Sequence, residues 1–374
     1  MRIRPIVWLN SVLALPAAVS LCAGIRNALT RSQDFQWSGA HLVLHHVDPY
    51  RQFLIHDPQH LILLSQVPNY LQELYILLLP LGAVSFPHAR PVWALLNCLF
   101  AVLITLILRR IYALERSQAL LLMLLLFAST PFRIVLGNGQ QSLLELLLFC
   151  LIFYFAKPVG QGIALGLSYS KYSFSPVVFL YLAFRRRFRV LAISLVPPLV
   201  GLLVMWLLVH GSIITLATEP LAVSRNGVTA GLGDLMTILQ TALHGILPEA
   251  LVGKLMYAAA LLSSVAYAYF LSRQQAVSVR RDAAALAVAN LMLFTHLTYD
   301  YVFLAIPLAA ALATPVRKVK IYILAAIALL WFGIKLIPAS MTPSVSLMEQ
   351  LVVFLVLFGM LILLGRKDLA PSNG

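Results

Sequence analysis

The chain has 374 residues, of which 61% are hydrophobic and 11% charged, and its mean hydropathy is +0.91. Soluble globular proteins carry about 25% charged and about 45–50% apolar residues, so this composition excludes a soluble enzyme. The three cysteines lie inside apolar runs, at spacings that suit neither a disulfide framework nor a metal site. A net charge of +14 would suggest a nucleic-acid partner in a soluble protein, but here its distribution along the chain decides its meaning. The composition predicts a polytopic membrane protein.

Apolar runs recur along the whole chain, and a helix that crosses a bilayer needs about 20 apolar residues. The longer runs are Pro5–Ala23, Pro91–Leu108, Ala119–Leu136, Leu143–Ala156, Val190–Val209, Ala250–Leu271, Ala283–Phe294, Ile321–Ile337 and Leu351–Leu364. Three shorter runs, Gly160–Tyr169, Phe174–Phe184 and Tyr301–Ala313, are typical of helices that stop at a buried cavity. We therefore expect one all-α domain over residues 1–374, with about 12 transmembrane or partly spanning helices.

Basic residues orient these spans, because cytoplasmic loops collect lysine and arginine. With the N-terminus inside, the cytoplasmic segments receive 18 of the 27 basic residues: Arg2, Arg4, Arg109, Arg110, Arg116, Lys157, Arg185, Arg186, Arg187, Arg189, Arg273, Arg280, Arg281, Arg317, Lys318, Lys320, Arg366 and Lys367. The charge is therefore a topology signal and predicts no nucleic-acid partner. Both termini are expected in the cytoplasm. The run Tyr75–Phe86, broken by Pro80, is expected to be an interfacial or re-entrant helix on the outer side.

Two large outer loops, 24–72 and 210–248, carry polar, aromatic and proline residues, which indicates ordered structure. In the first loop, Asp34 follows the first span, and a helix would put it on one face with Trp37 and His41. The alternative for Asp34 is a helix N-cap. Further polar candidates in the same loop are His45, His46, Asp48 and Tyr50.

Ionisable residues beside membrane helices are functional candidates, because burying them is costly. Lys171 stands between two short apolar segments and before Pro176. Its compact charge suits a phosphate, and the alternative is a lysine that extends to the membrane interface. His296 and Asp300 are four residues apart and would share a helical face, which suits metal binding, orientation of a base or a satisfied core histidine. At the outer end of another span lie Arg133, Asn138 and Gln140.

These polar residues collect on one side of the expected membrane. Transporters and channels usually carry polar residues at mid-depth in several spans, and the inverted repeats of many transporters are not evident here. The sequence also has no P-loop, no H-E-x-x-H zinc motif and no G-x-S-x-G serine motif. The one-sided distribution favours an enzyme that works at the outer leaflet.

Four ordered segments resemble the polyprenol-phosphate-mannose-dependent mannosyltransferases of glycosyltransferase family 87, which have the C-type glycosyltransferase fold. They are Asp34-Phe35-Gln36-Trp37 with Val47-Asp48-Pro49-Tyr50; Asn138-Gly139-Gln140-Gln141-Ser142 before a leucine-rich span; the glycine-rich run 160–167 with Lys171, Pro176 and Arg185-Arg186-Arg187; and Thr295-His296-Leu297-Thr298-Tyr299-Asp300-Tyr301. The resemblance extends from residue 34 to about residue 310.

The resemblance implies an inverting glycosyltransferase that moves a hexose, with mannose expected, from a polyprenyl-phosphate donor to a hydroxyl group of a glycan or glycolipid. It implies that Asp34 is the general base and that Lys171 stabilises the departing phosphate. The other residues that it assigns to the donor are His296, Tyr299, Arg133, Arg225, Gln140 and Asn138, and those for the acceptor or for support are His45, His46, Asp48, Tyr50 and Asp300. No metal or other cofactor is expected, because a monophosphate donor needs less charge neutralisation than a nucleotide diphosphate. The active site is expected on the periplasmic side of a bacterial inner membrane.

The sequence leaves three alternatives open. A transporter or flippase for lipid-linked sugars would use the same basic groups. The same fold could use another lipid-linked sugar, such as glucose or arabinose. A non-catalytic membrane scaffold would leave the polar clusters unexplained.

Overall fold

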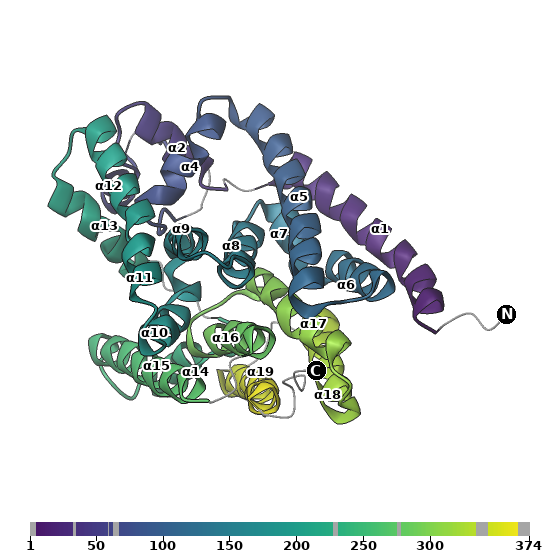
Figure 1. Ribbon diagram of the computed structural model, residues 1–374. Helices are drawn as coiled ribbons and strands as arrows, with labels where there is room; N and C mark the ends of the chain where they lie inside the picture. The colour runs from purple at the N-terminus through teal and green to yellow at the C-terminus, as the bar shows by residue number, and fades with distance from the viewer. Residues whose placement is uncertain are drawn as a thin grey trace.

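The computed structural model describes residues 5–32, 35–58, 60–62, 67–226, 231–274, 278–333 and 343–365, and this part of the chain is all-helical (Figure 1). Side chains are described throughout these ranges except at positions 5, 225, 226 and 343–345. Asp34, the expected general base, lies outside the described residues, as do residues 1–4 and 366–374 at the two ends.

In chain order the helices are α1 (Pro5–Arg31), α2 (Trp37–Leu44), α3 (Pro49–Leu54), α4 (Gln72–Gly82), α5 (Phe86–Tyr112), α6 (Arg116–Ala128), α7 (Thr130–Asn138), α8 (Ser142–Tyr154), α9 (Pro158–Ser168), the 3₁₀ helix η1 (Tyr169–Phe174), α10 (Pro176–Phe184), α11 (Phe188–Ser194), α12 (Val196–Val209), α13 (Ile213–Asn226), α14 (Leu235–Leu243), α15 (Glu249–Ser272), α16 (Val279–Leu293), the 3₁₀ helix η2 (Thr298–Leu304), α17 (Ala305–Ala313), α18 (Arg317–Ala328), the π-helical turn η3 (Leu329–Gly333) and α19 (Pro343–Leu364).

Five stretches of the described chain are long and apolar enough to cross a membrane: Ile6–Arg31, Phe86–Tyr112, Phe188–Val209, Glu249–Ser272 and Ser346–Leu364. The bent pair α6–α7 would make a sixth. Shorter apolar helices, among them α4 and α8, lie beside these stretches. The protein is therefore an integral membrane protein, whereas the expected number of about 12 spanning or partly spanning helices is not confirmed.

The run Ala119–Leu136, expected to be one span, is divided between α6 and α7, whose axes differ by 61°. Pro131 stands in the first turn of α7, where its missing N–H is tolerated, whereas in a continuous helix it would remove a backbone hydrogen bond. The hydroxyl of Ser129 caps the new helix by accepting from the Phe132 N–H at 3.2 Å. The segment after this bent pair, residues 139–142, is buried in the protein.

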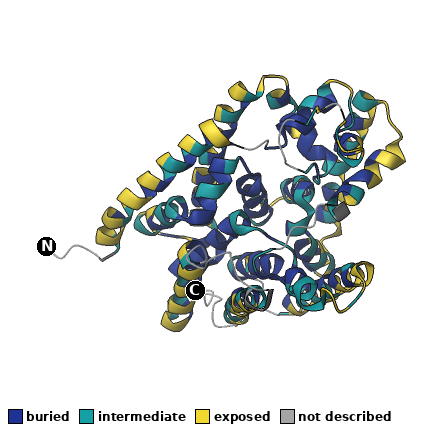
Figure 2. Cartoon of the chain, turned by 180° about the vertical axis from the view of Figure 1, so that it is seen from behind, coloured by how far each residue is buried: buried dark blue, intermediate teal, exposed yellow. Residues whose placement is uncertain are grey.

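The first span is longer than expected, and the first outer loop is correspondingly shorter than the predicted 24–72. Helix α1 continues to Arg31, because the side of its last turns packs on α7, with Gly24 against Leu136 and Asn27 against Gly137. Its other side is exposed along most of its length (Figure 2). The second loop has the expected bounds, since α12 ends at Val209 and α15 begins at Glu249. Both loops contain helices, α2 and α3 in the first and α13 and α14 in the second.

The centre of the protein is formed around α16, which is buried from Arg281 to Leu293. Figure 1 shows it surrounded by α10, α15, α17 and α19, and each of these helices contacts it. Alanines occupy much of α16 and allow its neighbours to approach closely, as small residues do in membrane-helix packing. The chain continues from its C-terminal end into the segment that carries His296.

Helix α9 packs on α11 through two glycines, Gly162 and Gly166, spaced as in a G-x-x-x-G motif. A methyl group on Gly166 would lie 2.4 Å from the Ser194 carbonyl oxygen, and one on Gly162 would lie 2.6 Å from the Ile193 Cβ. Backbone contact of this kind fixes α9 closely against its neighbour. Because α9 leads directly into η1, this packing also fixes the position of Lys171.

Candidate active site

Lys171 lies at a break in the chain between α9 and α10. Its backbone, at φ −113° and ψ 79°, departs from helical geometry within η1, and α10 begins at Pro176, whose fixed φ suits a helix start. The Lys171 ammonium also lies 4.9 Å from the centre of the Tyr299 ring and 5.2 Å from that of Phe174. About 15% of its side chain is exposed. The predicted apex is confirmed, and its lysine points into the protein with access from outside.

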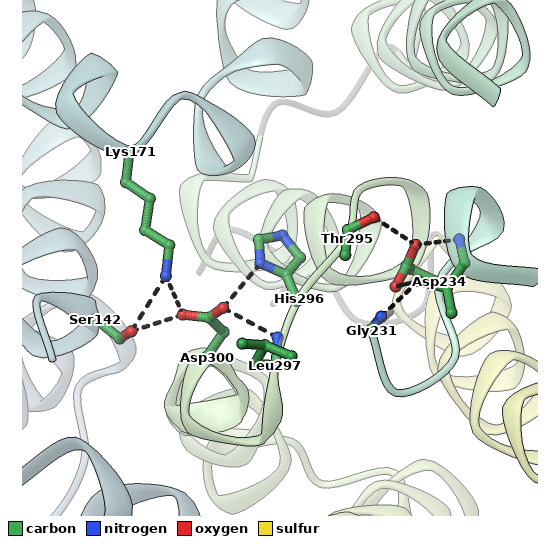
Figure 3. A network of polar contacts seen from close by, with 9 residues as sticks. Ser142, Lys171, Gly231, Asp234, Thr295, His296, Leu297 and Asp300 are labelled. Atoms are coloured by element: carbon green, nitrogen blue, oxygen red, sulfur yellow. Dashed lines mark hydrogen bonds and ion pairs between the residues drawn. The ribbon is translucent and has the colours of Figure 1, made fainter. Parts of the chain in front are cut away.

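Asp300 holds the Lys171 ammonium at 2.5 Å (Figure 3). The same carboxylate oxygen accepts from the Ser142 hydroxyl at 2.6 Å, while the other oxygen accepts from the Leu297 N–H at 3.2 Å and lies 3.3 Å from the His296 Nδ1. Burial alone would raise the pKa of Asp300, but the charge of Lys171 and the hydrogen bond of His296 hold it well below its usual range. Asp300 is thus an anion with both oxygens occupied.

His296 is positioned by stacking as well as by Asp300. Its ring lies 4.2 Å from that of Phe174, which in turn stacks on Phe303 at 3.8 Å. Its Nε2 has no hydrogen-bond partner among the described residues. The predicted pairing of His296 with Asp300 is confirmed, but the helical face that suggested it is wrong for His296, which precedes η2 in an extended segment.

A second polar network supports the segment around His296 (Figure 3). Asp234 caps α14 by accepting from the Thr237 N–H at 2.8 Å, and the same carboxylate accepts from the Thr295 hydroxyl at 3.4 Å. The Leu232 N–H donates to the His296 carbonyl oxygen at 3.1 Å. The second outer loop is therefore fastened to the residues that precede η2. Asp234 was not predicted from the sequence, although an aspartate directly before an apolar run is a common N-cap signal.

Other predicted donor residues are not joined to this cluster in the part of the chain that the structure describes. Asn138 and Gln140 flank the left-handed Gly139, whose carbonyl oxygen accepts from the Trp93 indole at 3.0 Å. Arg133 is half-buried in α7. The side chain of Arg225 lies outside the described residues. Roles for these four residues stay predictions.

Apart from Asp300, the predicted acceptor-side residues have their contacts within the first outer loop and with α12. Asp48 caps α3 by accepting from the Tyr50 N–H at 2.9 Å, and the Tyr50 hydroxyl donates to the Tyr70 carbonyl oxygen at 2.7 Å. His46 meets the Leu208 carbonyl oxygen at 2.5 Å. The exposed His45 packs edge-on against His41.

The expected shared face of α2 is confirmed for Trp37 and His41, whose rings stack at 4.5 Å. Asp34 precedes this helix, which begins at Trp37, and the N-cap position belongs to Gln36. Gln36 lies two residues after Asp34, and its side-chain amide donates to the Val67 carbonyl oxygen at 3.1 Å. The chain after Val67 then reaches η1, where the Leu71 N–H donates to the Ser170 carbonyl oxygen at 3.1 Å. These two hydrogen bonds, with residues 67–71 between them, therefore link Gln36 at the start of α2 to Ser170 in η1.

Two buried glutamates near this cluster were missed by sequence reasoning. Glu145 in α8 accepts from the hydroxyl of Ser170, the residue before Lys171. Glu73 in the first turn of α4 is 4% exposed. A charged residue inside or beside an apolar run was the available signal. Among the described residues, no group of three histidine, cysteine, aspartate or glutamate side chains could hold a metal ion.

No match was found among curated proteins or among solved structures. The sequence profile of glycosyltransferase family 87 matches residues 74–299, which is more than half of the chain. This range contains Lys171 and His296 and ends at Tyr299, next to Asp300. The chain belongs to glycosyltransferase family 87 and is a membrane glycosyltransferase of the C type.

Proposed function

We propose that the protein transfers a hexose, with mannose expected, from a polyprenyl-phosphate donor to a hydroxyl group of a glycan or glycolipid on the non-cytoplasmic side of the membrane. The observation that carries this proposal is the cluster around Lys171, where a partly exposed ammonium lies near the first turn of α8. Both the ammonium and the helix N-terminus favour an anion. A lipid-linked monophosphate would place its charge at this cluster and its apolar tail beside the apolar helices.

The donor phosphate would bind at Lys171 and at the N-terminus of α8. A helix N-terminus carries partial positive charge and free N–H groups, so it attracts phosphates. Ser142 begins this helix, and its hydroxyl already lies within the cluster. With its Nδ1 proton directed at Asp300, a neutral His296 presents Nε2 as an acceptor, which suits a hydroxyl group of the donor sugar. The phosphate would then share Lys171 with Asp300.

In the transfer, the acceptor hydroxyl oxygen attacks the anomeric carbon from the face opposite the phosphate. A bond forms between that oxygen and the anomeric carbon, while the bond from the anomeric carbon to the phosphate oxygen breaks and leaves its electron pair on polyprenyl phosphate. Asp34 accepts the hydroxyl proton, a role that needs a carboxylate within hydrogen-bond reach. Lys171 stabilises the charge that develops on the phosphate. The hydrogen bonds from Gln36 to Val67 and from Leu71 to Ser170 link the start of α2 to η1 through residues 67–71, which supports assigning Asp34 and Lys171 to one site.

The side of the membrane is supported by the distribution of charge along the helices. The candidate site lies at the N-terminal end of α8 and beyond the C-terminal end of α16. The opposite ends of these helices lie beside basic residues, with Arg110 donating to the Tyr154 hydroxyl and Arg280 to the Ile111 carbonyl oxygen. Because cytoplasmic segments collect arginine and lysine, the candidate site belongs to the other side.

The test is transfer of labelled mannose from synthetic polyprenyl-phosphate mannose by purified protein in liposomes that contain a glycolipid extract as acceptor. Wild type should release polyprenyl phosphate and form labelled glycolipid, and Asp34→Asn should form none. Asp57→Asn is the matched control, since Asp57 is a carboxylate of the same loop that accepts from the Leu61 and Ile62 N–H groups. Labelled lipid that crosses the bilayer without release of polyprenyl phosphate would indicate a flippase instead.

A further inference from the structure

Three buried polar side chains near the Lys171 cluster have atoms without hydrogen-bond partners among the described residues. These are both carboxylate oxygens of Glu73, both amide atoms of Gln141 and the Oε2 of Glu145. Glu73 is 4% exposed, and the other two are fully buried. The proposed function uses none of the three. Leaving buried polar atoms without partners costs free energy, so native proteins keep few of them.

Gln141 and Glu145 lie on one face of α8. Their backbones are joined by the first hydrogen bond of the helix, from the Glu145 N–H to the Gln141 carbonyl oxygen at 3.0 Å, and side chains four residues apart are neighbours on a helix. The hydroxyl of Ser142, which lies between them in the sequence, donates to Asp300. The occupied oxygen of Glu145 accepts from Ser170, beside Lys171. This face therefore borders the proposed phosphate site.

Glu73 approaches the same region from α4. It follows the segment whose Leu71 N–H donates to the Ser170 carbonyl oxygen at 3.1 Å. Its carboxyl group lies close enough to that of Glu145 for the two to repel when both are charged. Tyr70, in the same segment, has its hydroxyl within electrostatic range of Asp300, Glu145 and Tyr299. The free atoms of α4 and α8 thus gather beside the cluster that holds Lys171.

The chemistry of these atoms selects their ligand. Carboxylate oxygens accept hydrogen bonds, and an amide both accepts and donates, which matches hydroxyl groups. A second phosphate is disfavoured, because its negative charge would be repelled whenever either carboxyl group is ionised. A metal ion is disfavoured, because no group of three ligating side chains is formed among the described residues. A ring with several hydroxyl groups would satisfy all the free atoms at once.

We propose that Glu73, Gln141 and Glu145 form the subsite that recognises the hydroxyl groups of the transferred hexose. This inference rests on the proposed function, since it takes the donor phosphate to be at Lys171. The sugar is joined to that phosphate through a single oxygen, so its ring must lie beside the phosphate site. Glu73 and Glu145 accept from sugar hydroxyl groups, and Gln141 both accepts and donates. The subsite therefore determines which hexose the enzyme uses.

The experiment compares binding of two synthetic lipids, polyprenyl phosphate and polyprenyl-phosphate mannose, to the full-length protein in nanodiscs. We expect Glu73→Gln and Gln141→Leu to weaken binding of the mannose-bearing lipid about 10- to 100-fold, as expected when a hydrogen bond to a buried polar group is lost. Their affinity for polyprenyl phosphate should stay within twofold of wild type. Glu249→Gln, at an exposed position in the first turn of α15, is the matched control and should change neither affinity.

A second measurement separates recognition from a structural role. Without lipid, Gln141→Leu should melt at the same temperature as wild type or higher, because it removes a buried amide that has no hydrogen-bond partner among the described residues. A lower melting temperature with equal loss of both lipids would make the residue structural and overturn the subsite. Wild-type affinities of the variants for both lipids would also overturn it and leave the proposed function standing. If wild type binds neither lipid, the proposed function falls and the subsite falls with it.

Discussion

At the scale of single residues, the charge of Lys171 is balanced by that of Asp300. Removing Lys171 should therefore lower both the activity and the stability of the protein, for two different reasons. Under the proposed function, Lys171→Met should lower kcat/KM for sugar transfer by about 10²–10³-fold, because the departing phosphate would lose its cation. It should also destabilise the fold by about 3 kcal/mol, because Asp300 is left as a buried anion. The measurements are transfer kinetics and the thermal unfolding midpoint.

The double variant Lys171→Met/Asp300→Asn distinguishes the two effects. It removes both charges, so much of the lost thermal stability should return while transfer stays low. Transfer that recovers together with stability would contradict a role for Lys171 at the phosphate and would reduce it to a structural partner of Asp300.

The burial of Glu73 leads us to expect that the stability of the protein depends on pH. Burial raises its pKa from 4.5 to about 7, so the folded protein binds this proton more tightly than the unfolded chain. The associated stabilisation is complete below pH 4.5 and is lost as the pH rises to about 7, a change of about 3 kcal/mol for such a shift. The unfolding midpoint of wild type should therefore fall more between pH 5 and pH 8 than that of Glu73→Gln.

The control for this measurement is Glu219, which titrates in a similar range. Burial, together with a hydrogen bond to Asp48, raises its pKa to about 8. Glu219→Gln should keep the part of the pH dependence that belongs to Glu73. Equal pH slopes in wild type and Glu73→Gln would show that Glu73 does not carry a shifted pKa.

At the scale of elements, the close packing of α9 on α11 predicts that alanine substitutions at two glycines differ in their effect on stability. Gly166→Ala should destabilise the protein by about 1–3 kcal/mol, because the new methyl group meets the Ser194 carbonyl oxygen. Gly253→Ala in α15 meets no atom within 4 Å and should be neutral or slightly stabilising. Since α9 leads into η1, Gly166→Ala should also weaken binding of polyprenyl phosphate. Equal melting temperatures for the two variants would contradict backbone contact at Gly166.

At the scale of the whole molecule, the distribution of basic residues predicts that the two ends of the helical bundle face opposite sides of the membrane. Cysteines introduced into a cysteine-free protein at two exposed positions, Glu249→Cys at the start of α15 and Lys157→Cys before α9, test this. A membrane-impermeant maleimide added to intact cells should label Glu249→Cys. Lys157→Cys should react only after permeabilisation. The reverse pattern would contradict the proposed side of the site.

Much of the candidate site was accessible from local sequence patterns. A lysine between two short apolar segments and before Pro176 predicted the break that carries Lys171, because a proline cannot continue a helix without loss of a hydrogen bond. His296 and Asp300 were found together, although the helical spacing used to pair them is absent. Their contact comes instead from an extended segment that stacks on Phe174. The spacing of His296 and Asp300 along the chain thus identified the right pair of residues, but the helical geometry expected for them was wrong.

Composition and local pattern were enough to establish that the protein lies in a membrane and is built of apolar helices. The distribution of basic residues adds the prediction of which helix ends face the cytoplasm. These properties depend on composition and on short-range pattern, since each apolar helix satisfies its own backbone hydrogen bonds. The contact of Lys171 with Asp300, 129 residues away, became visible in the folded protein alone, as did the atoms of Glu73, Gln141 and Glu145 that have no hydrogen-bond partner among the described residues. Such contacts depend on how helices distant in sequence pack against one another, because the distance between two side chains in space is set by that packing and not by their spacing along the chain.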